Sequence, residues 1–278
     1  MTGVHRFPTE KARLRVRNPS GDVQIETGEV AETTVELVPL NDSDATREAI
    51  EKAIVSERGD DITVEIEGNR GWSITIGNWG IGSAKVSVRI TCPHGSELEC
   101  ETASADVRVT GTLGAARVRT ASGDLRLDRV EGSLEAKSAS GDVHVDHVEG
   151  RAALTTVSGD VSVRTAKGGL GVNAVSGDVE IGDVYGDVTL GTVSGDQVVR
   201  AAGPGEVALK AVSGDVVVSM RRGLRVRLDV NSVSGSIGSE LEVSNSPVAP
   251  RSDAPEASLR VRTVSGDVRI ARSAEAVA

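Results

Sequence analysis

The chain has 278 residues, a formal net charge of -10 and only 1% aromatic residues. An acidic chain without a basic block is a poor nucleic-acid binder, and no apolar stretch reaches the length of a membrane span. With 32 glycines against 8 prolines, the sequence predicts many tight turns. The core must be built from Val, Leu, Ile and Ala, which suits thin stacked layers.

The N-terminus and the cysteines favour an intracellular location. Residues Met1 to Pro8 contain no apolar run of the kind found in secretion signals, so we expect a cytoplasmic protein. Two cysteines, Cys92 and Cys100, are too few for a disulfide framework. We expect two free thiols, with a bridge between them as the alternative.

The first hundred residues predict strands around one short helix. Alternation predicts strands at 12–17, 23–25, 61–67 and 84–90. The helix is expected at about 43–55, because Asp42 or Ser43 can cap it and Ala49, Ile50, Ala53 and Ile54 give it an apolar stripe.

Both tryptophans, Trp72 and Trp79, lie in a glycine-flanked segment between these strands. In a chain with so few aromatics they could form a recognition surface, and they are our candidate interaction residues. The alternative is that they fill space at the N-terminal end, since buried tryptophan usually packs.

The tripeptide Ser-Gly-Asp recurs along the chain and defines a repeat. It occurs eight times, starting at Ser20, Ser122, Ser140, Ser158, Ser176, Ser194, Ser213 and Ser265, with near-copies at Ser104 and Ser234. From Ser104 to Ser194 the spacing is a strict 18 residues. A fixed period this short predicts a solenoid in which each repeat is one coil.

Residues 18 apart fall into columns that predict two strands per coil. The inward columns of the first strand read Leu125, Val143, Val161, Val179 and Leu127, Val145, Val163, Ile181, and the residues between them, such as Arg126 and His144, should point outward. A glycine column follows at Gly132, Gly150, Gly168 and Gly186, then a second strand, then a small-residue column at Thr120, Ser138, Thr156, Ala174 and Thr192. We expect a flattened coil with two parallel sheets, with a three-faced cross-section as the alternative.

The predicted organisation is one continuous elongated domain. Residues 1–100 would form a β-rich capping part, and residues 101–278 the regular solenoid with a loop insertion at about 244–257. The spacing loosens after Ser194: a one-residue insertion precedes Ser213, and the next spacings are 21 and 31 residues. We expect such irregularity at an end, where edge-to-edge pairing must be blocked.

The repeated tripeptide has a structural and a metal-binding interpretation. Glycine supplies a positive φ, and Ser and Asp side chains can bond backbone N–H groups one or two residues on. Alternatively, the aspartates could form a calcium ladder; its members would be Asp124, Asp142, Asp160, Asp178 and Asp196. Calcium-binding repeats carry more glycine than this one, so we favour the turn role and expect no metal or other cofactor.

Other candidate sites are weak. Cys92, His94 and Cys100 lack a fourth zinc ligand, and His144, Asp146 and His147 fall on solvent positions of one coil. No nucleophile elbow, phosphate-binding loop or catalytic triad pattern is present in the sequence. We therefore expect no enzyme.

The segments Val157–Val163, Val175–Ile181 and Val264–Ile270 resemble the bacterial putative-adhesin β-strand-repeat family, also called toastrack domains. The opening Arg17–Ile25 and the turn Ile90–Gly95 are similar to that family as well. The resemblance implies a single-stranded, right-handed β-helix-like solenoid without established catalytic residues. It also implies an association with bacterial envelope stress and signalling.

The function expected from these observations is a non-enzymatic interaction scaffold with an unidentified protein partner. We expect neither nucleic-acid binding nor membrane insertion, and the sequence leaves open whether the chain is a monomer or a homo-oligomer. The alternative function is an exported adhesin-like or polysaccharide-binding surface protein.

Overall fold

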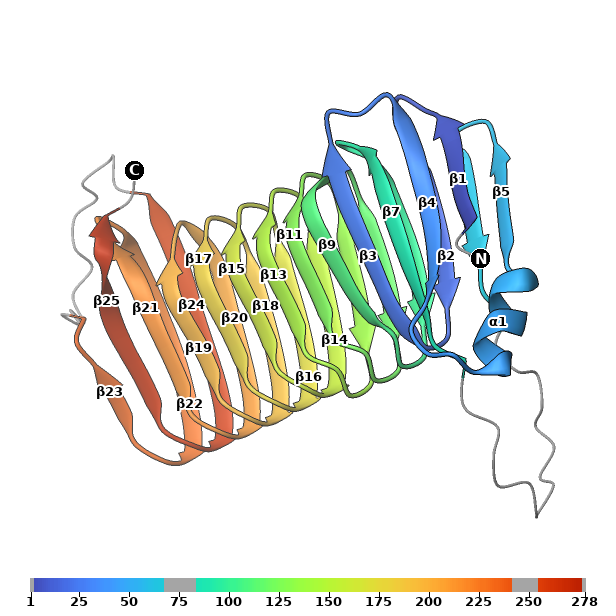
Figure 1. Cartoon of the computed structure of the whole chain (residues 1–278). Helices are drawn as coiled ribbons and strands as arrows, with labels where there is room; N and C mark the ends of the chain where they lie inside the picture. The colour runs from blue at the N-terminus through green and yellow to red at the C-terminus, as the bar shows by residue number, and fades with distance from the viewer. Residues whose placement is uncertain (1–2, 68–83, 242–254, 277–278) are drawn as a thin grey trace, which may run out of the picture. The chain divides into compact units, whose positions relative to one another are not determined.

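The computed structural model describes residues 3–67, 84–241 and 255–276, which are almost entirely β-strand (Figure 1). The chain divides into two compact units, Met1–Asp142 and Val143–Ala278. Each unit contains strands of two sheets, called sheet A and sheet B below.

Unit 1 contains twelve described strands and one helix. They are β1 (Gly3–Pro8), β2 (Arg13–Asn18), β3 (Gly21–Gly28), β4 (Glu32–Pro39), α1 (Asp44–Glu51), β5 (Ile54–Arg58), β6 (Asp61–Glu65), β7 (Val86–Pro93), β8 (Glu97–Thr102), β9 (Asp106–Leu113), β10 (Ala116–Thr120), β11 (Leu125–Val130) and β12 (Leu134–Ser138). Sheet A of this unit runs β1-β4-β7-β3-β9-β11, and sheet B runs β12-β10-β8-β2-β6-β5. The repeat strands pair in parallel, whereas β1, β4 and β5 pair antiparallel.

Unit 2 contains the remaining strands. They are β13 (Val143–Val148), β14 (Ala152–Ser158), β15 (Val161–Ala166), β16 (Leu170–Ser176), β17 (Val179–Val184), β18 (Val188–Ser194), β19 (Gln197–Ala202), β20 (Gly205–Ser213), β21 (Val216–Arg222), β22 (Arg225–Ser234), β23 (Ile237–Ser239), β24 (Glu256–Ser265) and β25 (Val268–Ala276). Sheet A of this unit runs β13-β15-β17-β19-β21-β25-β23, and sheet B runs β22-β24-β20-β18-β16-β14.

The predicted 18-residue columns are confirmed by the strand register. Val161 lies beside Val179 in sheet A, and Leu170 lies beside Val188 in sheet B. The inward side chains of both strands are buried: Val161 is 1% exposed and Leu170 3%. Each coil therefore contributes one strand to each of two sheets, and the thin aliphatic core lies between them. The two-sheet coil is the correct cross-section.

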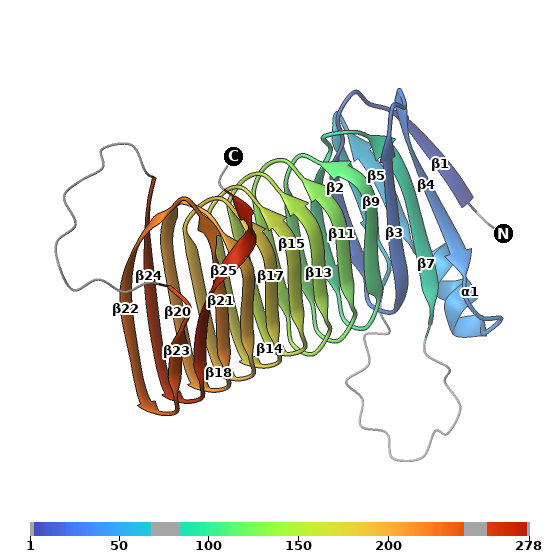
Figure 2. The ribbon, with the colours of Figure 1, turned by 90° about the vertical axis from the view of Figure 1, so that its left-hand side faces the viewer.

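Coil order in space differs from coil order in the chain at both ends of the repeat. In unit 2, β24 lies between β20 and β22, and β25 lies between β21 and β23 (Figure 2). In unit 1, β2 lies between β8 and β6, and β3 lies between β9 and β7. The loosened spacing after Ser194 thus reflects an inserted coil, which the sequence analysis did not predict.

The helix begins where it was expected and ends earlier. Ser43 caps it, its hydroxyl accepting a hydrogen bond from the N–H of Thr46, but α1 ends at Glu51. Ile54 instead begins β5, which pairs with β6 in a hairpin. The β-branched pair Ile54 and Val55 favours a strand over another helical turn. No helix in the described ranges is long and apolar enough to cross a membrane.

Two predicted features lie outside the described residues. Trp72 and Trp79 both fall in the segment 68–83, and the predicted loop at 244–257 falls mostly in 242–254. The last two residues of that prediction, Glu256 and Ala257, belong to β24.

Candidate functional site

The aspartates of the repeat bond from one coil to the next. The carboxylate oxygen Oδ1 of Asp178 accepts a hydrogen bond of 2.8 Å from the backbone N–H of Asp196, and Asp160 receives the equivalent bond from Asp178. Asp106 and Asp124 show the same contact in unit 1, each with the aspartate 18 residues on. These side chains therefore connect stacked coils. The expectation that they bond within their own turn is wrong.

In unit 1 the local turn bond comes from the small-residue column instead. The Thr120 hydroxyl accepts a hydrogen bond of 2.9 Å from the N–H of Gly123, and Ser138 does the same for Gly141 at 2.8 Å. The serine of the tripeptide reaches the neighbouring coil, since the Ser122 hydroxyl donates to the carbonyl of Ala103 at 3.2 Å. In this unit the corner thus uses the small-residue column for the turn and the Ser-Gly-Asp side chains for stacking.

The corner glycine is required by the close approach of the coils. Gly177 has a φ of +136°, and a Cβ built on it would lie 2.3 Å from the carbonyl oxygen of Gly159. Gly195 repeats this geometry one coil on, 2.2 Å from the oxygen of Gly177. No side chain fits there, so the glycines of the Ser-Gly-Asp tripeptides fix the spacing of the stack.

The aspartate ladder is a poor calcium site as it stands. Calcium takes six to eight oxygen ligands, but one carboxylate oxygen of Asp124, Asp160, Asp178 and Asp196 already accepts a backbone hydrogen bond. Within the described ranges, no group of three or more His, Cys, Asp or Glu side chains is placed to hold a metal ion. The predicted members Asp124, Asp142, Asp160, Asp178 and Asp196 take part in the hydrogen bonds that connect the coils. Calcium binding by this ladder stays a prediction.

Cys92, Cys100 and His94 are not arranged as a reactive site. Both cysteines are free and buried. Burial raises the pKa of Cys92 to about 11 and that of Cys100 to about 12, so neither thiol is poised as a nucleophile or ligand. The imidazole of His94 bonds through Nδ1 to the hydroxyl of Thr27 at 2.9 Å. The expectation of two free thiols is confirmed.

The second candidate cluster lies on the outer face of sheet A in unit 2. His144 Nε2 and Asp146 Oδ1 are 3.3 Å apart, and Arg164 reaches the same oxygen at 3.1 Å. His147 is half-buried on the same strand. This is an ordinary surface ion-pair arrangement, as the sequence suggested.

The structure contains a buried cation, Arg221, that the sequence analysis did not identify as a candidate. Arg221 is 3% exposed. Its guanidinium pairs with the carboxylate of Asp183, donates to the Tyr185 hydroxyl at 3.0 Å and stacks over the tyrosine ring at 4.6 Å. These residues come from coils far apart in sequence, so spacing alone could not connect them. The buried Arg221 therefore links β21 to the end of β17.

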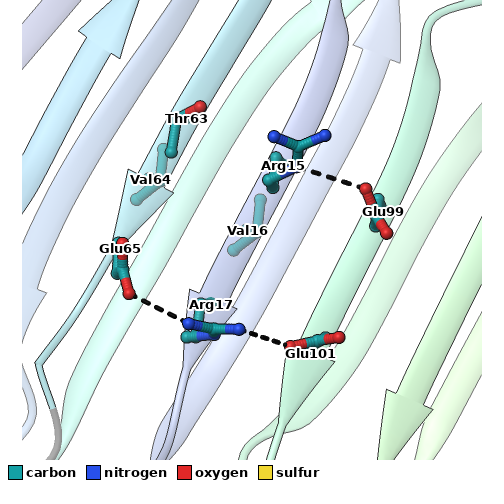
Figure 3. A pocket seen from close by; sticks show the side chains of 8 residues that line it. All are labelled: Arg15, Val16, Arg17, Thr63, Val64, Glu65, Glu99 and Glu101. Carbon is teal, nitrogen blue, oxygen red and sulfur yellow. Dashed lines mark hydrogen bonds and ion pairs between the residues drawn. The ribbon is translucent and has the colours of Figure 1, made fainter.

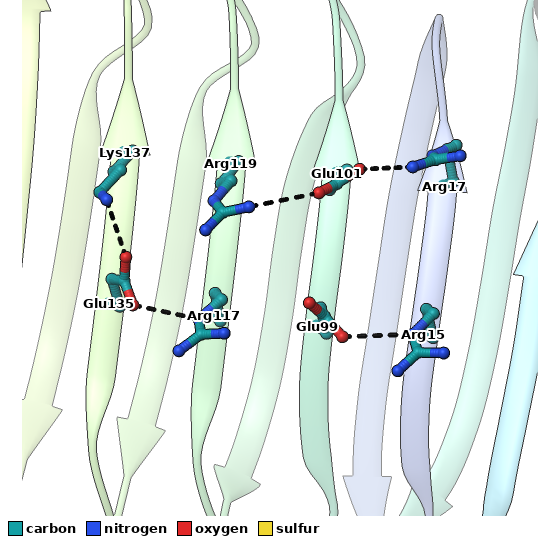
Figure 4. A network of polar contacts seen from close by, with 8 residues as sticks. All are labelled: Arg15, Arg17, Glu99, Glu101, Arg117, Arg119, Glu135 and Lys137. Carbon is teal, nitrogen blue, oxygen red and sulfur yellow. Dashed lines mark hydrogen bonds and ion pairs between the residues drawn. The ribbon is translucent and has the colours of Figure 1, made fainter.

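The outer face of sheet B in unit 1 carries alternating charge, and we call it the charged face (Figure 4). Its strands lie in the order β6, β2, β8, β10, β12. From β6 to β10 acidic and basic strands alternate, and β12 carries one charge of each sign. The charged side chains are Asp61, Glu65, Arg13, Arg15, Arg17, Glu97, Glu99, Glu101, Arg117, Arg119, Glu135 and Lys137. Arg17 Nη2 lies 2.9 Å from Glu101 Oε2, and Arg117 Nε lies 3.0 Å from Glu135 Oε2.

A shallow groove of about 210 Å³ lies within the charged face (Figure 3). Its two guanidinium groups already have carboxylate partners: Arg15 pairs with Glu99 at 3.2 Å, and Arg17 pairs with Glu65 at 3.1 Å and with Glu101. The paired charges lower the pKa of Glu101 through its hydrogen bond to Arg17. The groove therefore offers no unpaired guanidinium group to bind an isolated anion.

The outer face of sheet B in unit 2 is different on β14, β16 and β18, because these three strands place no charged side chain on it. One valine per coil stands about half-exposed on it; the ladder consists of Val157 (53%), Val175 (47%), Val193 (50%), Val212 (49%) and Val264 (50%). The outward residues beside them on β14, β16 and β18 are small and uncharged: Ala153, Thr155, Gly171, Asn173, Thr189 and Gly191. We call these residues together the valine face.

The valine face could have been found from the sequence. Each of these valines directly precedes a Ser-Gly-Asp and directly follows a buried small residue, such as Thr156 before Val157. Period-2 alternation along a strand then places the valine outward. The sequence analysis did not single these valines out.

A parallel two-sheet stack of short repeats, with a mainly aliphatic core between the sheets and most polar side chains on the outer faces, defines a β-solenoid scaffold. The sequence profile of the Toastrack family, DUF4097, matches residues 11–271. The chain belongs to this family, which is not defined by an enzymatic activity.

Comparison with curated proteins gave no match. Among solved structures, the chain is similar to a "putative lipid binding protein" from Parabacteroides distasonis, with 12% identity, 96% of each chain covered and a TM-score of 0.46. It is also similar to a "putative adhesin" from the same organism (11%, 97% of each chain, 0.42) and to one from Bacteroides fragilis (14%, 97% of each chain, 0.40). At these identities and scores the structures do not bear on the function of this chain.

Proposed function

We propose that the chain is a non-catalytic scaffold that binds a protein partner on the valine face. The observation that carries the proposal is the ladder of half-exposed valines on adjacent strands of one sheet. Single exposed apolar residues are ordinary, but contiguous apolar patches on a protein surface mark interaction sites.

The shape and charge of this face suit a protein better than a small molecule. The depression along Val157, Val175, Val193 and Val212 has a volume of about 380 Å³, but it is an open sheet surface. Small-molecule sites are concave and enclose most of the ligand. Strands β14, β16 and β18 place no charged side chain on this face, so a partner that covers these three strands would bury no unpaired charge there. Lys210 of β20 lines the depression beside Val212.

The proposal is tested by a paired substitution with a matched control in the same unit. Val175→Lys with Val193→Lys places two charges on neighbouring strands of the valine face. The control, Val198→Lys with Val217→Lys, changes two paired outward valines on sheet A. A photo-cross-linking residue at position 157 then identifies the proteins that contact this face in cells.

The expected result is that a defined partner cross-links at position 157, is lost with the Val175/Val193 variant and is kept by the control. Equal capture by all three chains, or no contact from position 157, would contradict the proposal. Thermal unfolding of both double variants confirms that they are folded.

The finer aspects of this function stay predictions. They are the cytoplasmic location, the absence of a cofactor, the absence of nucleic-acid and membrane partners, and a role in envelope-stress signalling. The alternative, an exported adhesin-like or polysaccharide-binding protein, is decided by surface labelling of intact cells. Labelled protein would favour it.

A further inference from the structure

Strand β22 forms an open edge of sheet B in unit 2. Among the described residues its one hydrogen-bonded neighbour is β24 (Figure 2). The strand has 10 residues, which is long for a strand at an edge. A long unpaired edge presents a row of backbone donors and acceptors, and proteins usually keep such edges short or cover them. The other side of β22 is therefore a place where a further strand can pair.

The inward side chains of β22 are less buried than those of its neighbour. Val226, Leu228 and Val230 are half-buried, whereas the β24 residues beside them, Ala257, Leu259 and Val261, are 4%, 1% and 0% exposed. On β23, at the same end of sheet A, Ile237 is 49% exposed. The aliphatic core thus ends here with its last layer partly in solvent.

We propose that β22 pairs antiparallel with β22 of a second copy of this chain, about a two-fold axis at Leu228. The backbone limits the possible registers. Arg225 donates its N–H to the carbonyl of Pro255 at 3.0 Å, so odd-numbered residues along this stretch point their backbone groups toward β24. Even-numbered residues point theirs toward the open edge. A two-fold pair can be centred on an even-numbered residue, which then bonds to its own equivalent, or on an odd-numbered residue, which then faces its own equivalent without bonding to it. Between Val226 and Val230 the odd-numbered centres are Arg227 and Asp229, and each would place like charges directly opposite each other. The remaining centres are Val226, Leu228 and Val230.

Charge and apolar matching select Leu228 from these three centres. With the axis at Leu228, Arg227 lies opposite Asp229 of the second copy, and the reciprocal pair forms as well. An axis at Val226 would place Arg225 opposite Arg227 of the second copy, with like charges facing. An axis at Val230 would place Leu228 opposite the polar Ser232 of the second copy.

The selected register also covers the exposed core layer. Val226 lies opposite Val230 of the second copy, and Leu228 lies opposite its own equivalent. Asp229 keeps its present contact with Arg260, at 3.3 Å, because that contact lies on the β24 side. The two-fold contact uses the same strand on both chains and closes on itself, so it produces a dimer and not a filament.

Charge-swap variants test both the contact and its register. Arg227→Asp places two aspartates opposite two others, and Asp229→Arg places arginines opposite arginines, so each variant alone should dimerise at least about tenfold more weakly. Mixing the two variants restores complementary charges in a heterodimer. Arg108→Asp, an exposed residue of unit 1, is the matched control. Sedimentation velocity is measured over about 10 to 200 µM chain, because small interfaces associate weakly.

The expected pattern is a dimer for the unsubstituted chain and the control, a monomer for each single variant, and a dimer again for the mixture. A monomeric unsubstituted chain overturns the proposal. So do single variants that still dimerise, or a mixture that stays monomeric. Neither substitution touches Val157, Val175 or Val193, so partner capture on the valine face is measured independently.

Discussion

Asp178 and Asp196, 18 residues apart, are joined by a hydrogen bond of 2.8 Å from the backbone N–H of Asp196 to the carboxylate of Asp178. The N–H of Asp178 in turn donates to Asp160. Each aspartate therefore accepts a bond on one side and donates one on the other, so that the repeated acidic residue connects successive coils.

Replacing Asp178 by alanine should destabilise the protein by about 1 to 2 kcal/mol. The substitution removes the acceptor for the Asp196 N–H, and charge-assisted hydrogen bonds contribute about this much. Asp178→Asn retains an oxygen in the same place and should lose clearly less. Urea denaturation of the three chains measures the difference. Equal loss for alanine and asparagine would show that the hydrogen bond does not matter.

Substitution of the corner glycine should be far more damaging than substitution of a strand glycine. Gly195→Ala needs an unfavourable φ of +139° and a Cβ 2.2 Å from a carbonyl oxygen, so we expect a loss of at least about 3 kcal/mol or no folded protein. Gly171→Ala is the control, because its Cβ would have no neighbour closer than 3.9 Å. That variant should change the free energy of unfolding by less than about 1 kcal/mol. Circular dichroism during urea titration compares them, and similar stabilities would contradict the close-approach argument.

Much of the fold could be predicted because the spacing of the repeat specifies which residues lie beside one another on neighbouring strands. A constant spacing aligns Val161 with Val179 without any structural knowledge, and alternation then identifies the buried face. Coil order at the ends could not be predicted in this way. The strands β20 and β24 pair with Val207 beside Leu259, 52 residues apart, and no local pattern specifies that coil insertion.

The candidate sites were harder to predict for a different reason. A sequence gives residue types, but the outward chemistry depends on which strands become neighbours. Arg17 meets Glu65 and Glu101 only because β2 lies between β6 and β8. The valine face was accessible in principle, since its residues belong to the regular repeat.

The charged face should make stability depend on pH below neutrality. The hydrogen bond from Arg17 lowers the pKa of Glu101 from its ordinary value of 4.5. A lowered pKa in the folded state means that the ionised pair stabilises the fold above about pH 4.5, and that this contribution is lost as the pH falls through the folded-state pKa. Because the Glu101 side chain is 39% exposed, the effect should be no more than about 0.5 kcal/mol.

Glu101→Gln should therefore reduce the gain in stability between about pH 3 and pH 6, and added salt should reduce it in the unsubstituted chain. Urea denaturation at the two pH values, with and without salt, measures both effects. An unchanged pH dependence in the variant would show that the pair does not contribute.

The two thiols should be unreactive while the protein is folded. Burial raises the pKa of Cys92 to about 11 and that of Cys100 to about 12, so at mildly alkaline pH almost no thiolate is present, and the surrounding core blocks access. Reaction with a chromogenic disulfide reagent should be slow in buffer and complete, with both thiols modified, in denaturant. Thr155→Cys, which adds a thiol at an exposed strand position, should react rapidly in the folded protein and serves as the control. Rapid modification of both native cysteines without denaturant would mean that the stack opens readily between β7 and β8, since no thiol buried to this degree can react from the closed state.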